Sequence, residues 1–137
     1  MDDNILKYIP QRRPFVMVDG IVMCDEECCR TEFGITEDCV MVEHGKLREA
    51  GVLENIAQTC ASRIGYVSLQ IRHEPIRMGV IGAVKQFKMY SMPRVGERLE
   101  TEVVVVGEFF DMMVLDARVF CNGEVVASCE IKVALLN

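Results

Sequence analysis

The stretch EAGVLENIAQTCASRIGYVSLQ, residues 49–70, decides the fold of this chain. Its apolar residues recur at steps of three and four, which is the period of one face of an α-helix: Leu53, Ile56, Ala57, Cys60, Ile64 and Val67. No other part of the chain keeps this period for as long. The sequence therefore predicts one long amphipathic helix from about Glu49 to Gln70.

Beyond this helix the apolar period changes to two, which is typical of β-strands with one buried face. Leu99, Thr101 and Val103 alternate with charged residues, and the runs 115–121 and 125–135 alternate in the same way. Asn122-Gly123 between those two runs is a strong signal for a tight hairpin turn. Further strands are predicted at Phe15–Met23, Cys29–Ile35 and Gly79–Tyr90, the last ending before Pro93 and Gly96.

The predicted order is two strands, one long helix and four more strands. A single helix with one apolar face can bury that face only by lying across the antiparallel sheet. The fold class is therefore α+β, with a sheet wrapped around one helix. Because such a sheet leaves open edges that commonly pair with another copy, a homodimer is expected.

Composition limits the function. The 137 residues, half of them hydrophobic, fit a single domain covering 1–137, and the net charge of -6 argues against nucleic acid as a partner. The acidic start at Met1 and the absence of a membrane-length apolar stretch predict a mature cytoplasmic protein that is not inserted in a membrane. Seven cysteines with no CxxC pair indicate reduced thiols, and neither metal-ligand spacing nor a phosphate loop points to a metal or cofactor.

Two helix residues could carry chemistry. Glu54 and Gln58 stand one turn apart, beside the apolar face, and Ala61 and Gly65 continue their stripe. No cation lies three or four positions from Glu54, so this carboxylate has no local salt bridge. The stripe suits a narrow cleft for an elongated ligand, and a solvated Glu54 near the helix start is an equally good reading. His44 precedes the helix in a polar segment and, on its own, reads as a surface residue, as does His73 beyond the helix.

Two segments carry a resemblance to a known family. YIPQRRPFVMVD, residues 8–19, resembles the opening segment of the beta-hydroxyacyl-acyl-carrier-protein dehydratases, and ENIAQ, residues 54–58, is similar to the signature on their central helix. Weaker likenesses at MPRVGE, residues 92–97, and GEVVA, residues 123–127, follow in the family's order. The resemblance implies a hotdog fold, a dimer with acyl tunnels at its interface, and an acyl-carrier-protein or coenzyme A thioester as substrate.

The resemblance also implies site roles. Glu54 matches the family's catalytic acid, His44 would be the base, Gln58 would position Glu54 or the ligand, and backbone amides near Gly51 would polarise the thioester carbonyl. The loop around His44 departs from the family, because it is shorter and lacks the Pro and Phe residues found there.

Three hypotheses therefore stay open. The chain is a beta-hydroxyacyl thioester dehydratase of fatty-acid or polyene-like biosynthesis, a hotdog thioesterase in which Glu54 activates water, or a catalytically silent acyl-binding subunit that works with a second hotdog chain. A local basic rim that could receive an acidic carrier protein is suggested by Arg12, Arg13, Arg94 and Arg98.

Overall fold

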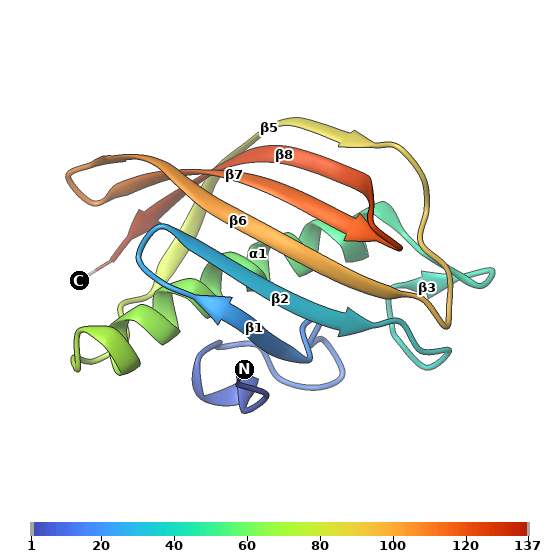
Figure 1. Cartoon of the computed structure of the whole chain (residues 1–137), viewed down its shortest axis with the longest axis horizontal. Coiled ribbons are helices and arrows are strands. Elements are labelled where there is room, and N and C mark those ends of the chain that lie inside the picture. The colour runs from blue at the N-terminus through green and yellow to red at the C-terminus, as the bar shows by residue number, and fades with distance from the viewer. Residues whose placement is uncertain (1, 137) are drawn as a thin grey trace.

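The computed structural model describes residues 2–136 and shows one long helix lying across one face of a six-stranded antiparallel sheet (Figure 1). The strand order in the sheet is β1-β2-β6-β7-β8-β5. This arrangement confirms the predicted α+β class. The elements are η1 Ile5–Lys7, β1 Gly20–Cys24, β2 Cys28–Gly34, β3 Val42–Glu43, β4 Lys46–Leu47, α1 Glu49–Tyr66, η2 Val67–Ile71, β5 Gly79–Met89, β6 Arg98–Phe109, β7 Met112–Cys121 and β8 Glu124–Leu135.

Helix α1 and the single π-helical turn η2 follow each other without a break and together span the whole predicted range, with one residue more at the end. Val52, Ile56, Cys60 and Ile64 recur every four residues and are all buried against the sheet. Burying side chains of this size contributes roughly 1.5–3 kcal/mol each, so packing stabilises the helix although its first residue has no side-chain cap.

The first predicted strand, Phe15–Met23, was placed too early. Strand β1 begins only at Gly20, and residues 16–19 belong to no strand. The backbone of Met17 is instead bonded by side chains of α1. Alternating residues cannot distinguish a backbone paired with a strand from one paired with helix side chains.

A short hairpin, β3–β4, was missed by the sequence prediction. Its strands have two residues each, which is too short to show a period. His44 and Gly45 form its turn and both have positive φ, at 54° and 74°. Leu47 is completely buried and anchors the hairpin to the core just before α1 starts.

The longer hairpin between β7 and β8 agrees with its prediction. Asn122 and Gly123 connect these strands with φ of 53° and 79°, the positive values that a tight hairpin turn requires.

The two edges of the sheet differ. At β1 the backbone of Asp2 exchanges hydrogen bonds with Ile21, so the amino terminus covers that edge. At the other edge, β5 pairs only with β8 and leaves Val80, Ile81 and Val84 between 37% and 45% exposed. An open edge with exposed apolar residues is a favourable surface for pairing with another chain.

None of the helices in residues 2–136 combines the length and the apolar character that a membrane crossing would require.

Candidate active site

Gln58 is the centre of the candidate site. Its side chain is completely buried, where an amide must satisfy its hydrogen-bonding groups within the protein. The Met17 N–H donates to Gln58 Oε1 at 2.6 Å, and Gln58 Nε2 donates to the Phe15 carbonyl at 2.8 Å and to Glu54 Oε1 at 3.0 Å. The adjacency of Glu54 and Gln58 that the helical spacing predicted is therefore present.

Glu54 stands at the edge of an apolar cleft between α1 and β5. The carboxyl is half-buried, and Gln58 is its hydrogen-bond donor. This Glu54 cleft has a volume of about 260 Å³, and its other lining residues are all apolar: Ala50, Leu53, Ala57, Ile81, Val84 and Ile131. A carboxylate at an apolar cleft is a candidate for proton transfer to or from a bound ligand.

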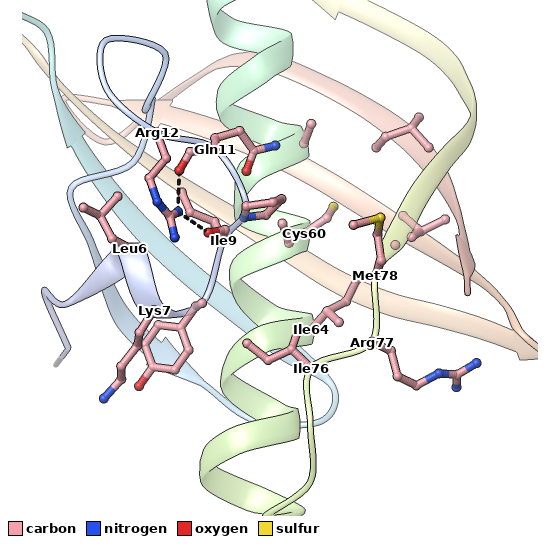
Figure 2. Close-up of a pocket in the computed structure, with 17 residues that line it drawn as sticks. Leu6, Lys7, Ile9, Gln11, Arg12, Cys60, Ile64, Ile76, Arg77 and Met78 are labelled. Atoms are coloured by element: carbon pink, nitrogen blue, oxygen red, sulfur yellow. Dashed lines mark hydrogen bonds between the residues drawn. The ribbon is translucent and has the colours of Figure 1, made fainter. Parts of the chain in front are cut away.

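A second cavity continues along the same side of α1. This α1 cavity has a volume of about 350 Å³ and shares Ala57 and Ile81 with the Glu54 cleft. Figure 2 shows Cys60 and Ile64 of α1 between the amino-terminal segment and the residues that precede β5. Burial raises the pKa of the Cys60 thiol to about 12, so this cysteine is a neutral wall residue rather than a nucleophile.

Gly51 has a packing role that differs from the one expected. Its N–H donates to the Arg48 carbonyl at 2.9 Å, so this amide is not available to a ligand. A Cβ at Gly51 would lie 2.6 Å from a methyl carbon of Leu47, which explains the need for glycine. Within residues 2–136 the Ala50 N–H has no acceptor, and Ala50 lines the Glu54 cleft. The amide that could polarise a carbonyl is therefore Ala50 rather than Gly51.

His44 lies at the tip of the β3–β4 hairpin, and its side chain is 87% exposed. Its nearest charged neighbour is Glu43, with 3.5 Å between His44 Nε2 and a carboxylate oxygen. His44 does not line the Glu54 cleft or the α1 cavity. The structure thus places Glu54 and Gln58 together and leaves His44 on the surface of its own chain. His73 is also exposed, as expected.

Two arginines of the predicted basic rim have partners within the chain. Arg98 pairs with Glu32 at 3.1 Å, while Arg12 donates to the carbonyls of Ile9 and Gln11 at the mouth of the α1 cavity. No group of three or more His, Cys, Asp or Glu side chains within residues 2–136 is placed to hold a metal ion.

The long helix on an antiparallel sheet, with a glutamate and a buried glutamine beside the cleft, is the arrangement of a hotdog-fold protein related to dehydratases. Comparison with known proteins makes this specific. A family model described as ApeP dehydratase matches residues 3–136, and the chain belongs to this ApeP-like dehydratase family.

One sequence relative and two solved structures are also similar to this chain. The chain is 26% identical over 141 residues to the 3-hydroxyacyl-[acyl-carrier-protein] dehydratase FabZ of Campylobacter lari, covering 98% of this chain and 96% of the relative. The fold resembles a chain of the dehydratase heterocomplex ApeI:P from Xenorhabdus doucetiae, with a TM-score of 0.88, 14% identity, and coverage of 97% and 91%. It also resembles a hypothetical thioesterase with coenzyme A from Streptococcus pneumoniae, with a TM-score of 0.70, 9% identity, and coverage of 85% and 84%. The resemblance drawn from the sequence motifs is thus confirmed.

Proposed function

We propose that this chain is a dehydratase subunit that removes water from a 3-hydroxyacyl thioester carried on an acyl-carrier protein. The observation that carries the proposal is Glu54, bonded by Gln58 at the edge of an apolar cleft that adjoins a second cavity. The similarity to FabZ, whose name states such a substrate, supports the same reading.

The chemistry requires two proton transfers and one polarised oxygen. A base takes the proton from the carbon next to the thioester carbonyl, the bond between the β-carbon and the hydroxyl oxygen breaks, and that oxygen leaves as water after receiving a proton. Glu54, which lines the cleft, would exchange a proton with a substrate bound there. The Ala50 N–H, at the positive end of the α1 dipole, would stabilise the charge that develops on the thioester oxygen.

The cavities suit a linear acyl chain. From Glu54 to Ile64 the two adjacent spaces follow α1 for ten residues, or about 15 Å at the rise of an α-helix. Small side chains at Ala57 and Ala61 keep this side of the helix open. A substrate whose thioester lies at Glu54 would extend its tail past Cys60.

A second hotdog chain would complete the site along β5. The exposed apolar residues of β5 lie beside both cavities, because Ile81 lines each of them. Pairing there would cover the apolar edge and close the clefts against water. The partner is a second copy of this chain or a different hotdog chain.

His44 remains the predicted base. Since its ring is exposed at a hairpin tip, it could act only in the site of an adjoining chain, not in its own cleft as this structure holds it. Replacement of His44 by Ala tests whether His44 is the base. A fall of a hundredfold or more in the hydration rate, with unchanged stability, supports the role, and full activity would exclude it.

The proposal is tested by offering hydroxyacyl, enoyl and saturated acyl thioesters to the purified chain, alone and with a candidate hotdog partner. Dehydration or hydration supports it, hydrolysis would indicate a thioesterase, and binding without turnover a silent subunit. Glu54→Gln should keep the fold and abolish turnover. The control is Glu49→Gln, an exposed carboxylate in the first turn of the same helix, which should leave the rate unchanged.

A further inference from the structure

A path of hydrogen bonds runs from strand β6 through the core to Glu54. Thr101 Oγ1 donates to Asn55 Oδ1 at 2.5 Å, and Asn55 Nδ2 donates to the Met17 carbonyl at 2.7 Å. From there the path passes from the Met17 N–H to Gln58 and from Gln58 Nε2 to Glu54. Thr101, Asn55, Met17 and Gln58 are all at most 1% exposed, so water cannot substitute for any of these bonds.

The direction of every bond on the path is fixed by the backbone of Met17. A carbonyl can only accept, so the amide nitrogen of Asn55 must face Met17, and the oxygen of Asn55 is left to accept from the Thr101 hydroxyl. An N–H can only donate, so Gln58 must turn its oxygen toward Met17 and its nitrogen toward Glu54. The orientation of a side-chain amide is often ambiguous. Here the Met17 carbonyl determines the orientation of Asn55, and the Met17 N–H determines that of Gln58.

All donors on this path therefore point toward Glu54. The carbonyl and the N–H of Met17 belong to two peptide units that meet at its Cα, so the path acts by holding this backbone segment in place. The last donor on the path is Gln58 Nε2, which bonds Glu54 Oε1 at 3.0 Å. This bond leaves Oε2 of Glu54 for a ligand in the cleft.

We propose that Asn55 and Thr101 are positioning residues for Glu54, acting through Met17 and Gln58. This inference rests on the proposed function for its catalytic meaning, since Glu54 is the residue that would exchange the proton. Neither Asn55 nor Thr101 lines the Glu54 cleft, so neither would touch the substrate.

The chain contains a matched control for Thr101. Thr31 on β2 is its direct partner across the two strands, and it is equally buried. The Thr31 hydroxyl bonds to the hydroxyl of Thr59, which donates to the backbone carbonyl of Asn55, so Thr31 is not on the path to Glu54. Thr101→Val and Thr31→Val each remove one buried hydroxyl and add one methyl group, and they should cost similar stability.

The first measurement needs no substrate. The side-chain amide ¹⁵N–¹H signals of Gln58, assigned by their loss in Gln58→Leu, are recorded by NMR in the wild type and in both threonine variants. In Thr101→Val these signals should shift, because the Met17 backbone that holds the Gln58 amide loses part of its support. In Thr31→Val they should stay at their wild-type positions. Equal Gln58 signals in the two variants would overturn the inference.

Kinetics provide the second measurement. Thr101→Val should lower kcat several-fold with little change in KM, whereas Thr31→Val should change neither. Asn55→Leu, which also frees the Met17 carbonyl, should lower kcat at least tenfold; if it fails to fold, the threonine pair still decides. The failure modes are distinct, because full activity in Glu54→Gln would refute only the proposed function, and identical threonine variants would refute only the positioning path.

Discussion

Replacing Gln58 by Leu tests whether the site and the amino-terminal segment depend on the same buried amide. Leucine has a similar size, so the change removes hydrogen bonds with little change in packing. The Met17 N–H, at a completely buried residue, loses its acceptor, which costs about 1–3 kcal/mol for an unsatisfied buried donor. The Phe15 carbonyl adds little, because Phe15 is exposed and water can replace the amide there.

Urea unfolding measures this cost. With a slope of about 2 kcal/mol per molar urea, a loss of about 2 kcal/mol lowers the midpoint by about 1 M at an unchanged slope. Ser62→Ala is the control, one turn further on the same helix and equally buried. Its hydroxyl donates to the Gln58 carbonyl, which already accepts a helical hydrogen bond, so its loss should cost less than about 0.5 kcal/mol. If Gln58→Leu shifts the urea midpoint no more than Ser62→Ala does, the hydrogen bond from the Met17 N–H to Gln58 does not stabilise the fold.

Three further predictions concern other parts of the molecule. Burial and the hydrogen bond to Asp2 raise the pKa of Tyr8 to about 12. The protonated Tyr8 therefore stabilises the fold fully below pH 10, and this stabilisation is lost between about pH 10 and 12. The free energy of unfolding of Tyr8→Phe should not fall over that pH range. Val80→Lys should weaken chain pairing at least tenfold in sedimentation experiments while leaving the unfolding midpoint of the isolated chain nearly unchanged, and undiminished pairing would place the interface elsewhere. Gly65→Ala should cost about 1–3 kcal/mol in urea unfolding despite the better helix former, because its Cβ would lie 2.3 Å from the Tyr8 carbonyl oxygen.

The helix and its polar pair could be predicted because both depend on local spacing. Residues three or four apart share a face of any helix, so the period identified Ile56, Cys60 and Ile64 as buried. The same spacing brought Glu54 next to Gln58. The hairpin signal at Asn122-Gly123 is local in the same sense and was confirmed.

What could not be predicted depends on contacts between distant parts of the chain. Met17 and Gln58 are 41 positions apart, and nothing in the segment around Met17 distinguishes a partner on a helix from a partner on a strand. Gly51 differs for a local reason, because its N–H donates to the Arg48 carbonyl three positions earlier and the apolar pattern does not show which first-turn amides are bonded. The exposure of His44 agrees with what its polar segment alone indicated. The hairpin that carries it was missed because its strands have only two residues each, below the length at which a period exists.

The buried face of α1 explains why replacing Gln58 should reduce both stability and turnover, whereas replacing Glu54 should reduce turnover alone. Asn55, Gln58, Thr59 and Ser62 are all completely buried, and a helix with so many polar groups in a core would be unstable without partners. Met17, which has no place in the sheet, supplies backbone partners to Asn55 and Gln58 and is held by them in return. Gln58 therefore belongs to the fold as much as to the site, and its loss should reduce both stability and turnover. Glu54 only receives the last bond of the path and lies at the cleft, so its replacement by Gln should reduce turnover alone.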